Sequence, residues 1–308
     1  MLLNWHIGLA CFCLSFVSIC LNLLIFIPVF RFAFFGKKSS IYLIAFFNII
    51  SDLLQLFVAC FHSSLSIIFG RYVLTGARIN NLSVFFGWIH MNGWFMESLV
   101  QPVMALNRFV VITLNKNNIF TFQRTIFIFI ILITLTSFSA ACIQYFLPCC
   151  VLIVDIDIMS YMFLSIEGVH SYSNDILLVY DVFCTSISTF CYVSVFIYIR
   201  NANRNVEDSV QSNKRKQEAR YLFQFVFISI FYVAVWILFQ ILPYIVPADQ
   251  PIWFSSVPFL VTLNCSSNSV IYLMYNTELQ KSLKSCFCRK NGQSVESIVH
   301  PTRTLSTQ

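Results

Sequence analysis

The sequence predicts an all-α membrane protein, a bundle of seven transmembrane helices followed by a short amphipathic helix on the membrane surface. Of its 308 residues, 58% are hydrophobic and 10% are charged, and the mean hydropathy is +0.77. A soluble domain of this length could not bury so much apolar surface, which excludes a water-soluble enzyme. Apolar runs long enough for a helix to cross about 30 Å of hydrocarbon occur seven times. Lys and Arg gather in alternate connections between those runs.

The boundaries follow from the charged or proline-containing stretches that separate the apolar runs. The spans cover about residues 7–30, 41–69, 82–114, 125–147, 176–199, 221–246 and 253–275, and the surface helix covers 276–288. Together they form one predicted domain, residues 1–290, with a flexible cytosolic tail at 291–308.

The first three spans differ in how many charges they carry. The first is an uncharged apolar run that ends at Arg31, the second contains Asp52, and the third contains Glu97 and Arg108. Ionisable side chains inside the membrane are expensive and usually functional. We therefore expect the second and third helices to face the interior of the bundle along their charged sides.

The remaining spans are bounded by prolines and acidic loops. The fourth has no charged residue and stops at Pro148, after which the connection 148–174 contains acidic residues and no Lys or Arg. The fifth leads into a basic connection, 200–220, which we expect to be a loop. The sixth contains Pro243, and Pro247 with its neighbours makes a tight turn into the seventh.

The distribution of basic residues predicts the orientation. The connections after the first, third and fifth spans and the tail hold three, two, six and five Lys or Arg residues, which is all but three of the 19. The positive-inside rule places these segments in the cytosol and the N-terminus outside the cell. The net charge of +6 is thus explained by membrane topology, and nucleic acid is not an expected partner.

The third span has one polar face. His90, Trp94, Glu97 and Gln101 recur at helical spacing, and Arg108 follows on the same side at the inner end. Because lipid offers these groups no hydrogen-bond partner, the face is expected to look into the bundle.

Polar residues at matching depth in other spans predict a buried cluster. Asp52 of the second span and Glu97 of the third lie at comparable depth, and the seventh offers Asn264, Asn268 and Tyr272. One interpretation is a set of interhelical hydrogen bonds that only holds the bundle together. The other is a hydrated site that changes state on activation. Two adjacent carboxylates in low dielectric would then share a proton or hold a cation such as Na⁺.

These positions resemble a rhodopsin-like G-protein-coupled receptor over residues 20–290. Asn107-Arg108-Phe109 resembles the family's Asp/Glu-Arg-Tyr motif, and Asn268-Ser-Val-Ile-Tyr272 resembles Asn-Pro-x-x-Tyr. Asn22 and Asp52 match polar residues of the first and second helices, and Leu242-Pro243-Tyr244 matches the proline kink of the sixth. The resemblance implies a heterotrimeric G protein as partner, with Arg108 reaching it when the sixth helix swings outward.

The sequence also departs from the rhodopsin-like motifs at several positions, and these differences indicate a narrower group of receptors. Asn107 replaces the acid that usually pairs with the arginine, Ser269 replaces proline, and the fourth helix lacks Trp. No Cys stands at the outer start of the third helix, so the family's usual disulfide to the second outer loop is absent. Such chains are similar to the nematode serpentine chemoreceptors, the x and xa classes above all. This resemblance implies a chemosensory receptor at the plasma membrane, with sensory cilia as the implied location.

A ligand pocket is expected between the outer halves of the third, fifth, sixth and seventh spans. The candidate lining residues are His90, Met91, Trp94, Asp181 and Tyr244. Each of them has helix packing as its alternative role. No carboxylate lies near His90 in the third span, which disfavours biogenic amines and leaves another small molecule or a peptide as the ligand.

The other candidate sites lie near the C-terminus. Leu279, Leu283 and Phe287 repeat at helical spacing and predict a surface helix on the inner leaflet of the bilayer. Cys286 and Cys288 at its end are candidate palmitoylation sites or free cytosolic thiols.

No enzyme, metal or cofactor motif is found in the sequence, and no catalytic residue is predicted. The alternative functions are a seven-span ligand-gated channel, whose N-terminus would lie in the cytosol, or another membrane transport protein.

Overall fold

The protein is a bundle of long helices, as the computed structural model shows. The structure describes residues 2–36, 40–116, 118–147, 150–164, 166, 168–203, 209–247 and 250–288, with side chains except at 202–225, 228 and 286–288. In chain order the helices are α1 (Leu2–Phe30) with η1 (Arg31–Phe35), α2 (Ser40–Phe57), η2 (Val58–Ser64), α3 (Leu65–Phe69), α4 (Asn81–Arg108) with η3 (Phe109–Thr113), α5 (Phe122–Ala141) with η4 (Cys142–Phe146), α6 (Tyr172–Asn203), α7 (Ser209–Ile245), η5 (Pro251–Ser255), α8 (Ser256–Tyr275) and α9 (Thr277–Cys288).

The predicted seven-helix bundle is confirmed. Among the described residues, six helical stretches are long and apolar enough to cross a membrane, and the apolar stretch Ser229–Ile245 of α7 supplies a shorter seventh. Large side chains cover the outside of the bundle: Phe138 is 63% exposed and Phe190 is 68% exposed. Such side chains are stable on this surface because lipid, not water, surrounds it.

Two boundaries differ from the sequence-based expectation. Residues 200–220 were expected to be a loop, yet α6 continues to Asn203 and α7 already begins at Ser209. Counting apolar residues misses these extensions, because Lys, Arg, Gln and Glu are good helix formers in water. Pro243, the expected kink of the sixth helix, lies inside α7 in its last turn, and the helix ends at Ile245.

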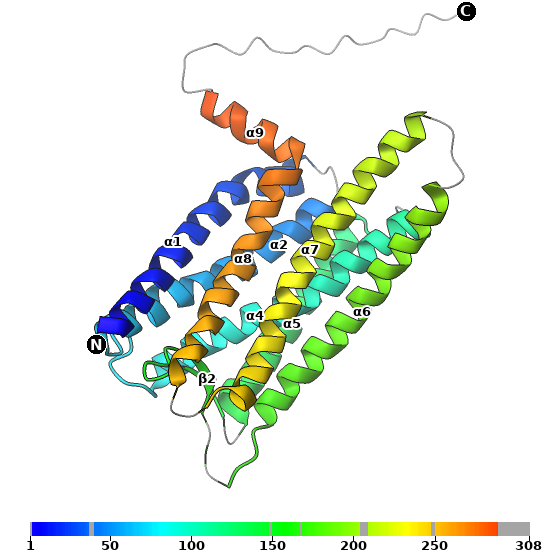
Figure 1. Cartoon of the computed structure of the whole chain (residues 1–308). Coiled ribbons are helices and arrows are strands. Elements are labelled where there is room, and N and C mark those ends of the chain that lie inside the picture. The colour runs from blue at the N-terminus through cyan, green and yellow to red at the C-terminus, as the bar shows by residue number, and fades with distance from the viewer. Residues whose placement is uncertain are drawn as a thin grey trace, which may run out of the picture.

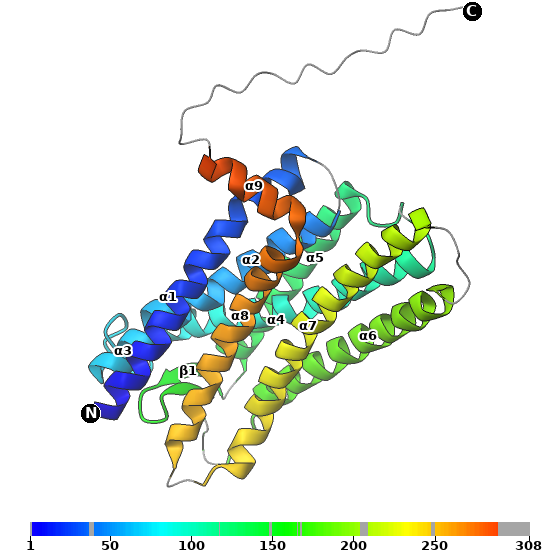
Figure 2. The ribbon, with the colours of Figure 1, turned by 45° about the horizontal axis from the view of Figure 1, so that its top comes forward.

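The two ends of the bundle carry different elements (Figures 1 and 2). At one end α9 lies across the bundle, and the C-terminal end of α6 and the N-terminal end of α7 point the same way. The N-terminus, the start of α8 and a two-stranded hairpin lie at the opposite end. The positively charged connections thus share the end marked by α9.

The hairpin is an element that the sequence analysis did not predict. Strand β1 (Leu152–Asp155) pairs with the antiparallel strand β2 (Ser160–Phe163), with Leu152 opposite Phe163. All four residues of β1 are buried. The hairpin therefore packs into the outer end of the bundle and covers it.

Helix α4 is the centre of the packing. It contacts α2, α5 and α6 along its length and β1 at its outer end, while α8 packs against α1, α2 and α7. Apolar layers above and below its middle fill the interior, with Trp94 and Phe95 in the outer layer and Val100 and Met104 in the inner one. The middle of α4 is where the polar residues meet.

Candidate functional site

The structure brings Asp52 and Glu97 together at the centre of the bundle. Ligand atoms of Asp52, Glu97 and Cys265 all lie within 4.8 Å of one another, and the three side chains are completely buried. Close packing of α2 on α4 makes this possible, because a Cβ on Gly93 would lie 2.6 Å from Cγ of Gln55. Ser51 also donates a 2.6 Å hydrogen bond to the Gly93 carbonyl and fixes the two helices at this depth.

Amide side chains bind both carboxylates. Asn268 donates to Asp52 at 2.8 Å, Gln55 donates to Glu97 at 3.0 Å, and Asn264 also donates to Glu97. Gln55 was not a predicted site residue, although its position one turn after Asp52 places it on the same face of α2. The predicted pair thus lies inside a network that joins α2, α4 and α8.

Asn22 connects this network to α1. Its amide donates to the Cys265 carbonyl at 3.2 Å, and its side-chain oxygen accepts a 2.7 Å hydrogen bond from Ser269. Ser269 occupies the position where the related motif has proline. The hydroxyl therefore supplies an interhelical contact that a proline could not make.

Several buried oxygens of the cluster accept no hydrogen bond. The buried atoms without a hydrogen-bond partner include Asp52 Oδ1, Gln55 Oε1, Asn264 Oδ1 and Asn268 Oδ1. Carboxylate and amide oxygens are the ligands that hard cations prefer, whereas the Cys265 thiol suits softer metals. The residues present therefore fit a cation such as Na⁺ held by oxygen.

Asp181 lies in a second polar network, not at a ligand-facing surface. Trp94 Nε1 and Ser98 Oγ each donate to Asp181 Oδ1 at 3.2 Å, and the Tyr232 hydroxyl bonds to the same oxygen. This network, which we call the aspartate junction (Trp94, Ser98, Asp181 and Tyr232), joins α4, α6 and α7. Ser98 and Tyr232 were missed because a lone hydroxyl in an apolar run gives no signal until its buried partner is known.

His90, Met91 and Trp94 do face a common space. They line an inner cavity of about 20 Å³, which is room for about one water molecule. Tyr161 of β2 closes it from outside and stacks on His90 with ring centroids 4.1 Å apart. Tyr244, the fifth predicted pocket residue, is 87% exposed and lies apart from this group.

The hairpin is held against α4 by close contact at Gly87. Gln144 of η4 donates to the Leu152 carbonyl at 3.0 Å and accepts from the Leu152 amide at 2.8 Å. A Cβ at position 87 would lie 2.1 Å from Gln144 Nε2 and 2.2 Å from the Leu152 carbonyl oxygen. Only glycine leaves room for this approach. We call these contacts of Gly87, Gln144 and Leu152 the hairpin anchor.

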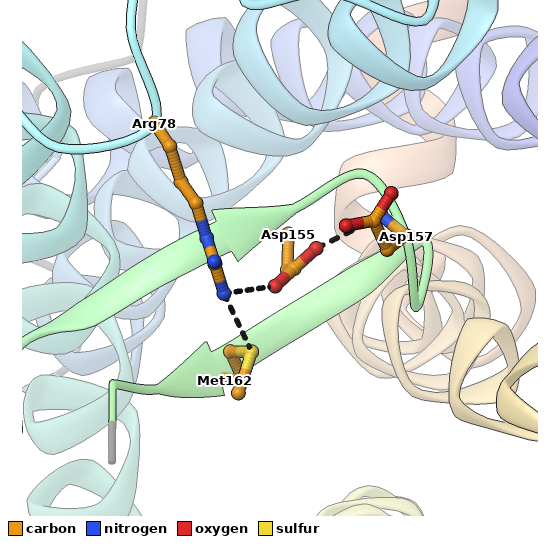
Figure 3. Close-up of polar contacts among 4 residues, drawn as sticks. All are labelled: Arg78, Asp155, Asp157 and Met162. Carbon is orange, nitrogen blue, oxygen red and sulfur yellow. Dashed lines mark hydrogen bonds and ion pairs between the residues drawn. The ribbon is translucent and has the colours of Figure 1, made fainter. Parts of the chain in front are cut away.

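An ion pair on the outer side adds to the anchor (Figure 3). Arg78, in the connection before α4, binds the Asp155 carboxylate and contacts the Met162 sulfur at 3.7 Å. The other Asp155 oxygen accepts a 2.8 Å hydrogen bond from the Asp157 amide. Asp155 is therefore fixed from two sides, and both strands are attached to the segment that precedes α4.

Helix α4 has no cysteine, so no disulfide joins it to the hairpin. Cys150, just before β1, is disulfide-bonded, while Cys11 in α1 and Cys142 in η4 are free. A bridge from the hairpin segment to Cys11 of the first helix is thus excluded.

Arg108 ends α4 at the inner end of the bundle. It is 5% exposed and packs near Ile44 and Met104, and Tyr192 and Tyr272 lie within electrostatic range of its guanidinium. Asn107 donates to Ser40 of α2 at 3.2 Å. Phe109 packs against the inner apolar layer. The three residues of the motif thus have different neighbours, and the Asn107 side chain is hydrogen-bonded to α2.

The sequence matches a known family over most of its length. Residues 12–276 match the family described as serpentine type 7TM GPCR chemoreceptor Srx. The chain belongs to the Srx family of chemoreceptors. The fold of this Srx receptor is similar to the crystal structure of squid rhodopsin, with a TM-score of 0.76 and 13% sequence identity. That likeness covers 94% of this chain and 86% of squid rhodopsin. No curated protein sequence matches the chain.

The receptor's α9 is attached to the bundle at its first turn. The Asn276 side chain accepts hydrogen bonds of 3.1 Å from the amides of Glu278 and Leu279, and Leu279 is completely buried. Tyr42 of α2 donates to Glu278 at 2.8 Å. The side chains of Cys286 and Cys288 and the predicted tail 291–308 lie outside the described residues, so palmitoylation remains a prediction.

Proposed function

We propose that this Srx receptor binds an extracellular small molecule or peptide and passes the change to a heterotrimeric G protein through its polar core. The observation that carries the proposal is the pair of buried carboxylates, Asp52 and Glu97, within 4.8 Å of each other. Along α4, Glu97 lies between His90 and Arg108. His90 lines the inner cavity near the hairpin, and Arg108 is the last residue of α4. Trp94 is one turn from Glu97 on α4, so a change of packing around Trp94 would also change the surroundings of the two carboxylates.

The core is suited to two states. Two carboxylates this close in low dielectric cannot both ionise without a proton or a cation between them. We propose that a cation such as Na⁺, held by Asp52, Glu97 and the oxygens of Asn264 and Asn268, favours one packing of α2, α4 and α8. Tyr272, one turn beyond Asn268 on α8, would then move relative to Arg108 when the core changes state. No enzymatic activity is proposed.

Asp52 and Glu97 are expected to behave as one site. Removing one carboxylate relieves the repulsion on the other, so Asp52→Asn and Glu97→Gln should be non-additive by roughly 0.5–3 kcal/mol. The measurements are thermal unfolding of the purified receptor and nucleotide exchange on a G protein, each in sodium chloride and in N-methylglucamine chloride. Each single variant should lose most of the wild-type dependence on Na⁺.

The matched control pairs Glu97→Gln with Asp175→Asn, a carboxylate at the exposed start of α6. These two changes should add, because the sites share no partner. Strict additivity of the Asp52 and Glu97 changes, with unchanged Na⁺ dependence, would reject the core site and leave the two acids as packing features.

We also propose that the N-terminus is extracellular and the C-terminus cytosolic at the plasma membrane, with sensory cilia as the location to examine first. The basic connections and α9 share one end of the bundle, which the positive-inside rule assigns to the cytosol. An epitope at the N-terminus should bind antibody on intact cells, and one at the C-terminus only after permeabilisation. The reverse pattern would favour the channel alternative.

A further inference from the structure

A second cavity lies outside the inner one, beside the hairpin. It has a volume of about 350 Å³, within the roughly 300–1,000 Å³ range of sites that enclose small ligands. Met162 and Phe163 of β2 form one wall, and Phe239 of α7 and Val257 of α8 form another. We call it the outer cavity. Tyr244, one of the predicted pocket residues, lies on its wall.

The described wall of the outer cavity contains no charged residue. Its polar side chains are two amides and the three hydroxyls of Ser171, Tyr161 and Tyr244. Asn174 and Gln240 exchange two hydrogen bonds of 3.2 Å, and the Ser171 hydroxyl is buried without a partner. A charged ligand would lose its hydration there and gain no counter-charge, which costs several kcal/mol or more. A neutral ligand with one polar group would lose little, because the amides or the serine can replace its hydrogen bonds to water.

Tyr161 separates the outer cavity from the inner one. Tyr161, Phe239 and Val257 line both cavities, and the Tyr161 ring stacks on His90. Burial raises the pKa of the Tyr161 phenol, so the hydroxyl stays neutral at physiological pH. A molecule that displaces this ring would join the two cavities and reach Trp94, a member of the aspartate junction.

We propose that the outer cavity is the ligand site and that it takes an uncharged, largely apolar small molecule with one hydrogen-bonding group. This inference rests on the proposed function, since it specifies the molecule to which the receptor responds. It narrows that proposal by excluding amines, carboxylates and peptides, whose charges the wall cannot compensate. Entry past Tyr161 would transmit occupancy through Trp94 to Asp181 and so to α7.

The first test uses four probes with the same eight-carbon chain: 1-octanol, 2-octanone, octylammonium and octanoate. Their effect on thermal unfolding of the full-length receptor in lipid nanodiscs is measured without a G protein. The two neutral probes should raise the unfolding temperature in a saturable manner and the two ions should not. No stabilisation by either neutral probe, or equal stabilisation by the ions, would overturn the proposal.

The second test changes the selectivity of the cavity. Gln240→Glu places a carboxylate of nearly the same shape in the wall, so octylammonium should bind at least about tenfold more tightly than to wild type while the neutral probes weaken. Asn174→Asp repeats the test from α6 if the first variant does not fold. Gln123→Glu, an exposed position at the cytosolic start of α5, is the matched control and should leave every probe unchanged.

The two proposals fail in different ways. The probes could bind, and their selectivity could change in the charged variants, without any effect on nucleotide exchange on a G protein. The outer cavity would then be confirmed as a binding site, and activation through it would be rejected. If Gln240→Glu and Asn174→Asp fold and show no gain for octylammonium, the cavity is rejected while the receptor's response to another molecule can still be measured. If a probe shifts the unfolding temperature equally in all variants, its effect is on the bilayer, and the outer cavity is again rejected as its binding site.

Discussion

Replacing Arg108 with alanine is expected to abolish G-protein activation while leaving the receptor folded and at the cell surface. The guanidinium is at the inner end of α4, within electrostatic range of Tyr192 and Tyr272, and the variant removes its charge. Basal nucleotide exchange should fall by at least about tenfold, within the roughly 5–150-fold range typical of coupling between sites. Nucleotide exchange on receptor-containing membranes, normalised to surface epitope, is the measurement.

Arg124→Ala is the matched control for this experiment. Arg124 is exposed at the start of α5 and donates to the Asn118 carbonyl at 3.0 Å, so its loss removes the same charge near the same end of the bundle. A companion variant, Asn107→Asp, should lower basal activity by supplying Arg108 with an acidic neighbour. Wild-type signalling by a surface-expressed Arg108→Ala receptor would show that this motif does not couple to the G protein.

The Gly87→Ala variant should destabilise the receptor and loosen the hairpin. Its new Cβ would overlap the Leu152 carbonyl oxygen and Gln144 Nε2, and the two are already bonded to each other. Overpacking of this kind costs typically about 1–3 kcal/mol. The unfolding temperature of the purified receptor should fall, and Tyr161 should become accessible to solvent as the hairpin lifts from the inner cavity.

Gly36→Ala tests the general effect of adding a methyl group. Gly36 is exposed and has φ −78°, a conformation that alanine adopts freely, so the change should be neutral or stabilise by up to about 1 kcal/mol. An unfolding temperature equal to wild type in Gly87→Ala would mean that the hairpin can shift without cost. The hairpin anchor would then have no structural role.

Much of the bundle could be predicted, because membrane thickness limits helix length and burial limits charge. The meeting of Asp52 and Glu97 followed from depth alone: two carboxylates in neighbouring spans must point inward, and few inward positions exist at one depth. Their amide partners on α8 followed for the same reason. The role of these residues in activation remains a prediction.

The outer end could not be predicted in the same way. Depth fixes how far along a helix a residue lies but not which neighbour its side chain meets. Asp181 was therefore assigned to a pocket, whereas its carboxylate binds Trp94, Ser98 and Tyr232. The hairpin depends on contacts of Gln144 and Leu152 with Gly87, which lies more than 50 residues earlier in the sequence. A glycine in one apolar helix and a glutamine at the end of another carry no separate signal for such a contact.

The hairpin anchor also sets how quickly the outer end can open. Hydrogen bonds to Leu152 break and re-form through local unfolding, at a free-energy cost below that of unfolding the bundle. Ligand entry would therefore be paced by a local opening step, and the amide of Leu152 would exchange its hydrogen with solvent at the frequency of that step. Single substitutions of Gln144 would therefore change the rate of this opening step, and with it the response time of the receptor.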